Sequence, residues 1–219
     1  MKFWKNLMEE LDMVIERDPA ARSRWEVYFL YSGFRAVHGY RIAHWFYLHN
    51  MKFIARWISQ SVRHKTGIEI HPGATIGRGL FIDHGMGVVI GETAEIGDNC
   101  TLYQNVTLGG TGKDTGKRHP TLGNNVMVGS GATGLGPFRV GDNTRIAAGA
   151  VVLTEIPDKA TAVGVPARVV RVNGMKVESS SLDQIHVSDP VQQEFKNVYD
   201  LVDRLQQKIQ QLEEQLSEK

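Results

Sequence analysis

Apolar residues recur at every sixth position through the central part of the chain, and this period constrains the fold more than any other feature. A helix repeats every 3.6 residues and an alternating strand every two, so neither element explains the pattern. A fixed period of six is the hexapeptide signature of a β-helix. The matching positions form three runs: Ile70, Ile76, Ile82 and Val88; Ile90, Ile96, Leu102 and Leu108; and Leu122, Val128, Gly134, Val140, Ile146 and Val152.

The β-helix also explains the residues that follow each apolar position. Each six-residue unit supplies a short flat strand and a turn, and three units make one triangular coil. The first residue of a unit points inward and stacks on its equivalents in the neighbouring coils. Glycine and asparagine follow in the turns, as in the VGDN of residues 140–143, because tight corners need unusual backbone angles.

One polar segment interrupts the period. Residues 109–120, GGTGKDTGKRHP, are rich in glycine and carry charges of both signs. A regular coil has no room for them, so we expect them to form a protruding loop. Long loops on a rigid scaffold often carry function.

The segment before the repeats has a different character. Residues 1–66 carry aromatic and aliphatic side chains at helical spacing, which predicts three or four helices. Asp18 and Pro19 fit the start of a helix, as N-cap and first helical residue, and Asn50 fits a helix end.

The segment after the repeats contains three further patterns. The sequence VVRVNGMKV predicts a hairpin around Asn173–Gly174, and residues 178–190 read as a linker. In residues 191–219 apolar positions alternate in spacings of four and three, which is typical of a coiled coil that joins protomers. These positions are Val191, Phe195, Val198, Val202, Leu205, Ile209, Leu212 and Leu216.

Together these patterns predict an α+β fold. We expect a helical domain over residues 1–66 and a left-handed parallel β-helix over 67–177, with the loop 109–120 protruding from it. The linker 178–190 and the coiled-coil helix 191–219 complete the chain.

Composition limits the function classes. The 25 basic and 24 acidic residues give a net charge of +1, which argues against a general nucleic-acid binder. Cys100 is the only cysteine, so no disulfide forms within the chain. No apolar run reaches the length of a membrane span, and the first residues lack a signal-peptide core. We therefore expect a cytoplasmic protein without membrane contact.

Reactive side chains gather in and beside the predicted β-helix: Glu69, His71, Asp83, His84, Arg118 and His119. Acyl transfer to an alcohol needs a base, and histidine has an unperturbed pKa of about 6.5, near the working pH. A carboxylate at the other ring nitrogen would fix its tautomer, and an arginine can hold the carboxylate of an amino acid.

The blocks GIEIHPGATIGRGLFIDHGMGVVIGETAEIG, VTLGGTGK and KRHP resemble the serine O-acetyltransferase family of hexapeptide-repeat acyltransferases in content, order and spacing. The segments RDPAAR and YRIAHW resemble the helical domain of that family, so the likeness covers roughly residues 10–172. It implies an enzyme that transfers acetyl from acetyl-CoA to L-serine for cysteine biosynthesis.

The resemblance also assigns roles to residues. His84 matches the general base, Asp83 the carboxylate that meets the amino group of serine, and Arg118 and His119 the loop pair that engages substrate, with Arg118 on the serine carboxylate. Glu69 stands where the family commonly has an aspartate that pairs with the base. A further aspartate of the helical domain has no clear counterpart, and Glu26 is the candidate to replace it.

By the same resemblance, acetyl-CoA lies in a groove between neighbouring β-helices, and no metal is expected. Arg145 would face a phosphate of CoA. The positions that match the groove are Gly110, Thr111, Ser130, Gly131, Arg145 and Ala148.

The resemblance further implies a homo-oligomer, either a trimer or a dimer of trimers, with L-cysteine as feedback inhibitor. The usual partner, the sulfhydrylase that consumes O-acetylserine, binds a C-terminal isoleucine. This sequence ends in Ser217-Glu218-Lys219, so we expect that mode of complex to be absent.

Three alternatives stay open at this point. The chain could be a hexapeptide acyltransferase that acts on a sugar hydroxyl. It could be a zinc carbonic anhydrase of the same fold, with His71, His84 and His119 as ligands. It could also be an inactive scaffold that only binds a partner enzyme.

Overall fold

The computed structural model describes residues 2–112, 115–177, 206 and 208. Apart from residues 206 and 208, the predicted linker at 178–190 and the predicted coiled coil at 191–219 lie outside the described residues. The unit described below is residues 2–177.

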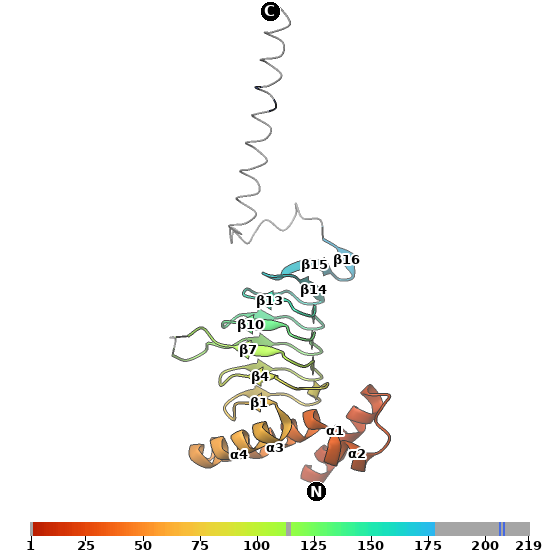
Figure 1. Cartoon of the computed structure of the whole chain (residues 1–219), viewed down its shortest axis with the longest axis vertical. Helices are drawn as coiled ribbons and strands as arrows, with labels where there is room; N and C mark the ends of the chain where they lie inside the picture. The colour runs from red at the N-terminus through yellow and green to blue at the C-terminus, as the bar shows by residue number, and fades with distance from the viewer. Residues whose placement is uncertain (1, 113–114, 178–205, 207, 209–219) are drawn as a thin grey trace, which may run out of the picture. The chain divides into compact units, whose positions relative to one another are not determined.

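Four helices precede the strands (Figure 1): α1 (Lys2–Arg17), α2 (Arg24–Leu30), α3 (Ser32–Leu48) and α4 (Lys52–Thr66). The predicted helix start at Asp18–Pro19 is wrong. The N-cap of α2 is Ser23, whose hydroxyl accepts the N–H of Glu26. The carboxylate of Asp18 instead accepts the N–H of Ala20 at 2.8 Å and closes a turn. Asn50 lies just beyond α3 with a φ of 62°, as a helix end requires.

The strands stack into the left-handed parallel β-helix that the sequence predicts (Figure 1). Each coil contributes one strand to each of three sheets. The five-stranded sheet contains β1 (Glu69–Ile70), β4 (Val89–Ile90), β7 (Thr107–Gly109), β10 (Thr133–Leu135) and β13 (Val151–Val152). The four-stranded sheet contains β2 (Thr75–Ile76), β5 (Glu95–Ile96), β8 (Thr121–Leu122) and β11 (Arg139–Val140). The seven-stranded sheet begins with β3 (Phe81–Ile82), β6 (Thr101–Leu102), β9 (Met127–Val128) and β12 (Arg145–Ile146).

The seven-stranded sheet is completed by β14 (Ala160–Val163), β15 (Arg168–Val172) and β16 (Met175–Lys176). The last two strands pair antiparallel, with Val172 opposite Met175. Asn173 and Gly174 have positive φ between them, which confirms the predicted hairpin.

The register confirms the inward stacking of the six-residue period. In the five-stranded sheet Ile70 pairs with Ile90, Ile90 with Leu108, and Leu108 with Gly134. The apolar members of the three runs are all at most 7% exposed and belong to one core cluster. Val88 is buried but precedes β4, so Ile90 and not Val88 occupies the stacked position.

The register also shows where the period breaks. From Ile82 of β3 to Ile90 of β4 the chain takes eight residues instead of six, and the two extra residues lie in the turn that carries His84. The second break lies between β7 and β8, where the described residues on both sides of 113–114 project away from the coils (Figure 1).

The helices close the end of the β-helix at its first coil. The N-terminus of α3 lies directly on β3, because a Cβ added at Gly33 would come 2.0 Å from the carbonyl oxygen of Ile82. From the other side Tyr40 donates its hydroxyl to the carbonyl oxygen of Ala74 at 2.6 Å. Helix α3 is therefore fixed against β3 and against the turn that precedes β2.

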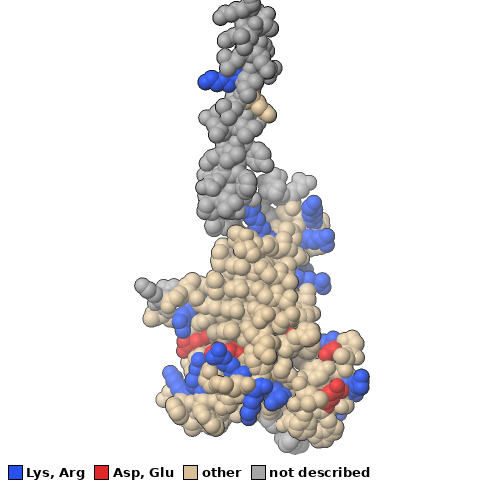
Figure 2. Space-filling view, viewed as in Figure 1, with Lys and Arg blue, Asp and Glu red and all other residues tan. Residues whose placement is uncertain are grey.

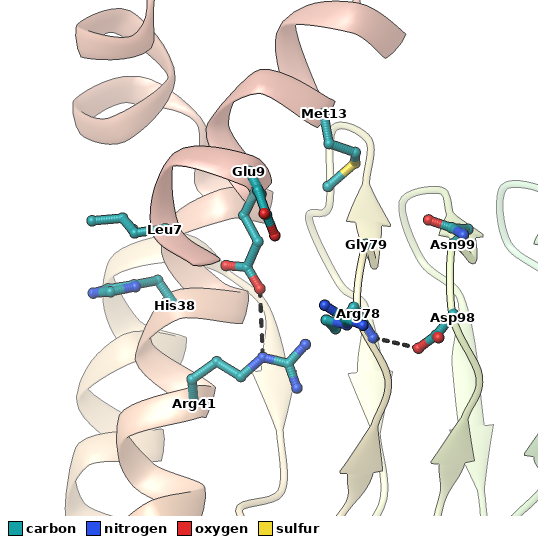
Figure 3. A pocket seen from close by; sticks show the side chains of 10 residues that line it. Leu7, Glu9, Met13, His38, Arg41, Arg78, Gly79, Asp98 and Asn99 are labelled. Atoms are coloured by element: carbon teal, nitrogen blue, oxygen red, sulfur yellow. Dashed lines mark hydrogen bonds and ion pairs between the residues drawn. The ribbon is translucent and has the colours of Figure 1, made fainter. Parts of the chain in front are cut away.

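A hollow of about 560 Å³ lies between α1, α3 and the turns that precede β3 and β6. Figure 3 shows Glu9, Arg41, Arg78 and Asp98 around it. No residue that the sequence assigns to the active site lines this hollow. Among the described residues, no helix has the length and apolar character that a bilayer crossing requires.

Candidate active site

The turn after β3 presents His84 to solvent. His84 has a φ of 57°, which is uncommon for a residue other than glycine or asparagine, and its side chain is 73% exposed. Ser32, the first residue of α3, donates its hydroxyl to the His84 carbonyl at 3.0 Å. The helical part thus supports the unusual backbone on which the predicted base stands.

Asp83 lies beside His84 in the same turn. One of its carboxylate oxygens is 3.8 Å from Nε2 of His84, too far for a hydrogen bond. The backbone N–H of Asp83 donates to the carbonyl of Leu102 in the next coil at 2.9 Å. The carboxylate of Asp83 is therefore held near the imidazole of His84 but does not form a hydrogen bond with it.

The corner that carries His84 continues along the coils, and we call it the histidine corner: the turns after β3, β6, β9 and β12. Backbone hydrogen bonds join these turns, from Gly131 to the carbonyl of Gln104 and from Gly149 to the carbonyl of Ser130. Ala148 lies in the last of these turns. Three of the predicted CoA positions, Ser130, Gly131 and Ala148, therefore share one corner with His84.

Small residues leave the turns after β9 and β12 open. Around Gly131 no heavy atom of the chain lies within 4 Å of an added Cβ. Parallel strands lie about 4.8 Å apart, so three coil steps separate His84 from Ala148 by about 14 Å. An extended, thin chain can follow the corner over this distance.

A second group lies at the corner that follows the five-stranded sheet, which we call the loop corner: the turns after β1, β4, β7 and β10. Arg118 donates to the carboxylate of Glu92 at 3.0 Å. Nδ1 of His119 is 2.8 Å from the hydroxyl of Thr93. Lys117 donates to the Thr93 carbonyl at 2.7 Å. The turn after β4 thus anchors the end of the protruding loop.

The electrostatics of the loop corner follow from these contacts. The hydrogen bond from Arg118 lowers the pKa of Glu92. Burial, then the charges of Arg118 and Lys117, lower the pKa of His119, whereas Glu92 raises it. Glu92 is therefore a carboxylate and His119 a neutral imidazole near pH 7.

The remaining predicted CoA residues are divided between the faces. Gly110 follows β7 and lies against the loop, because an added Cβ would be 3.1 Å from Cγ of Arg118 and Nε2 of His119. Thr111 follows it at the loop corner. Arg145 lies exposed in β12, on the seven-stranded sheet. The chain thus presents its predicted CoA residues on two different corners and, for Arg145, on a sheet face.

Glu69 and Glu26 have other partners in this structure. The two carboxylate oxygens of Glu69 contact Arg56 at 3.2 Å and Arg63 at 3.1 Å, both from α4. Glu26 accepts the backbone N–H of Arg22 at 3.1 Å and caps the start of α2. Among the described contacts, no hydrogen bond or ion pair joins Glu69 to His84, so its pairing with the base stays a prediction.

The sequence assigned no role to Glu92, Thr93 or Ser32. The motif IGET reads as an ordinary repeat with its turn, yet its last two residues hold Arg118 and His119. One feature of the sequence could have pointed to Glu92 and Thr93. They lie in the turn one coil before the inserted loop 109–120, where a turn has to anchor that loop.

The three histidines of the zinc alternative do not meet within the chain. His71 and His119 belong to the loop corner, where the pKa of His71 is lowered mainly by burial, whereas His84 stands on the histidine corner. Within the described ranges, no group of three or more His, Cys, Asp or Glu is placed to hold a metal ion.

The comparisons with known proteins agree on one family. Residues 119–154 match the family model "Bacterial transferase hexapeptide (six repeats)". The serine acetyltransferase of Bacillus subtilis strain 168 is 50% identical over 217 residues, which are 99% of this chain and 100% of that protein.

Two solved structures are similar as well. A serine acetyltransferase of Neisseria gonorrhoeae in complex with serine has a TM-score of 0.74 at 40% identity, over 78% of this chain and 69% of that one. A serine acetyltransferase in complex with cysteine has the same TM-score and identity, over 76% of this chain and 69% of that one. With a likeness that spans nearly the whole sequence and the fold of its described part, the chain belongs to the serine acetyltransferase family.

Proposed function

We propose that the protein transfers the acetyl group of acetyl-CoA to the hydroxyl of L-serine and so supplies O-acetyl-L-serine for cysteine biosynthesis. Family membership supports this reading over transfer to a sugar hydroxyl. The observation that carries it is the exposed Asp83–His84 pair at the head of an open corner of small residues. In this proposal the pantetheine arm follows the corner and its thioester lies beside His84.

In the proposed reaction His84 takes the proton of the serine hydroxyl as its oxygen attacks the thioester carbonyl. The tetrahedral intermediate then collapses, the carbon–sulfur bond breaks, and the proton passes from His84 to the sulfur of CoA. Asp83 meets the ammonium group of serine. Arg118 holds its carboxylate, since a guanidinium has five donors and the bond to Glu92 leaves others for the substrate.

The two corners meet between copies of the chain in this proposal. One copy supplies His84, Asp83 and the small residues of the histidine corner, and its neighbour supplies Arg118, His119 and Gly110 of the loop corner. Acetyl-CoA fills the groove between them, with Arg145 toward a phosphate. A trimer would build such a groove three times, and a dimer of trimers six times.

Regulation and location follow from the same chemistry. L-Cysteine has the carboxylate and amino group of serine, so it competes for the same contacts, and the solved complex of a relative with cysteine supports this. We place the enzyme in the cytoplasm, without a metal.

The test is a thiol-release assay with acetyl-CoA and a panel of L-serine, L-homoserine and simple sugars. We expect CoA release with L-serine well above the other acceptors, and less of it when L-cysteine is added. Equal or faster release with a sugar would overturn the proposed substrate, and stoichiometric zinc in the active protein would revive the metal alternative.

A further inference from the structure

We propose that Thr93 is a positioning residue that fixes the tautomer of His119, so that His119 presents an Nε2–H donor to the substrate. This inference rests on the proposed function, because it gives the loop-corner histidine a defined part in that reaction. It adds a residue from the repeat itself to the loop residues that engage serine.

The hydrogen bonds of the Thr93 hydroxyl determine where its proton points. Its oxygen accepts the backbone N–H of Arg118 at 3.0 Å and that of His119 at 3.2 Å. A threonine hydroxyl has two acceptor sites and one donor. With both acceptor sites occupied, its proton is left for the third neighbour, Nδ1 of His119 at 2.8 Å.

The backbone of Thr93 requires the same tautomer. Its N–H also points at Nδ1 of His119, at 3.2 Å. A backbone N–H only donates, so a proton on Nδ1 would face a donor and lose this bond. Both contacts thus make Nδ1 an acceptor, and in the neutral ring the proton lies on Nε2.

The surroundings keep the ring neutral. Lys117, Arg118 and His71 are the cationic or titratable groups that face His119, and Glu92 is the facing carboxylate. The ring is buried, with 6% of the residue exposed. Burial and the neighbouring cations lower the pKa of His119 against the effect of Glu92, which agrees with an acceptor role for Nδ1.

Gly91 leaves the space that the imidazole ring of His119 occupies. A Cβ added there would lie 2.0 Å from Cδ2 and 2.1 Å from Nε2 of His119. The Cδ2 and Nε2 atoms of the ring therefore lie close to the backbone of the turn after β4, with Thr93 on the Nδ1 side. Position and tautomer are both set by that turn.

This arrangement separates the two histidines by role. His84 is exposed and takes up a proton during the reaction. His119 keeps its proton on Nε2 and donates a hydrogen bond to a substrate oxygen without changing charge. Groups whose surroundings differ in this way can act as base and as donor in one site at one pH.

The experiment is nitrogen-15 NMR of the full-length protein with labelled histidine, read at neutral pH. A His119→Asn variant identifies the His119 signals by their absence. We expect Nδ1 unprotonated and Nε2 protonated in the unsubstituted protein. A proton on Nδ1, or an imidazolium, would overturn the inference without any need for a Thr93 variant.

Three variants connect the tautomer to turnover. Thr93→Val removes the hydroxyl and should give mixed tautomers, lower kcat/KM for serine about tenfold, and move the acidic limb of its pH profile to higher pH. Thr93→Ser should restore all three properties. Thr75→Val, at an exposed strand position, should behave as wild type.

The outcomes separate this inference from the proposed function. A protein without serine acetylation would refute the function, while the NMR spectrum still reads the tautomer. An active Thr93→Val enzyme with an unchanged spectrum and pH profile would refute the role of Thr93 alone.

Discussion

The regular coils of the β-helix and the two breaks in their period differ in what they contribute to this molecule. From β1 to β13 every strand has only two or three residues and places one of them at the inward, stacked position. The turn at His84 and the loop before Arg118 depart from that period and carry the reactive side chains. Regular coils form a rigid frame, and we propose that the two interruptions carry the active site.

The reason is geometric. In a regular coil each outward side chain stands above its equivalent in the next coil, so unlike groups do not converge. In the turn with two extra residues His84 has a positive φ and a side chain that is 73% exposed. The inserted loop folds back so that Arg118 and His119 meet the turn below. The four predictions that follow test this division, from the largest expected effect to the smallest.

The first prediction concerns the turn break. His84→Ala should lower kcat by about 10²–10⁴-fold, the usual contribution of a general base, while acetyl-CoA still binds and the melting temperature stays near that of wild type. Stopped-assay kinetics and CoA titration measure these effects. His64→Ala removes an exposed histidine of α4 and is the matched control. Near wild-type turnover in His84→Ala would mean that the general base does not lie in the turn after β3.

The second prediction concerns the frame. Ile96 is 3% exposed and pairs with Ile76 and Leu122 in the four-stranded sheet. Ile96→Ala should lower the free energy of unfolding by about 2–5 kcal/mol, measured by denaturant titration, with kcat unchanged where the protein is folded. Ile54→Ala, at a position 42% exposed, should cost far less. If Ile96→Ala lost turnover but not stability, the regular coils would contribute directly to catalysis, and the proposed division between frame and site would be wrong.

The sequence predicted the frame better than the site, for a physical reason. The six-residue period is set by burial, which every coil repeats, so the stack and the inserted loop could be located from residue types alone. The two extra residues in the turn at His84 became clear only from the strand register. The partners of the site residues come from tertiary contacts that no period encodes. Glu69 contacts two arginines of α4, and Thr93 contacts a residue 26 positions away.

Local signals also failed where one pattern fits two structures. Asp followed by Pro is typical of a helix start, but the same side chain can close a turn, and Asp18 does so. Ser23 and Glu26 carried the competing signal, since a serine with a glutamate three residues later is a capping pair.

The third prediction concerns the loop break. Arg118→Ala should raise the KM for serine about 10–100-fold, because one hydrogen bond to a charged group contributes about 1.5–3 kcal/mol, with a much smaller change in the KM for acetyl-CoA. Arg118→Lys keeps the positive charge but loses the two parallel donors of the guanidinium, so its KM for serine should lie between those of wild type and Arg118→Ala. Arg139→Ala, at an exposed strand position, is the control. Equal effects on both substrates would show that Arg118 does not hold serine.

The fourth prediction concerns Glu69, which could belong either to the frame or to the active site. Two roles compete for its carboxylate: partner of His84, as the resemblance implies, or anchor for α4 through Arg56 and Arg63. As an anchor its effect is small. The arginine side chains are 45% and 53% exposed, and such surface ion pairs contribute about 0.2–1 kcal/mol each.

Glu69→Gln separates the two roles, because it keeps the shape and removes the charge. If Glu69 acts on His84, kcat should fall by a few fold to tenfold, less than in His84→Ala, since the base itself remains. If Glu69 is only an anchor, kcat should hold and the free energy of unfolding should fall by about 1 kcal/mol or less. A double-mutant cycle with Arg63→Ala measures the second case directly, because residues in contact give non-additive effects. A fall in kcat that persists in the Arg63→Ala background would assign Glu69 to the site, whereas a coupling energy with unchanged kcat would assign it to the frame.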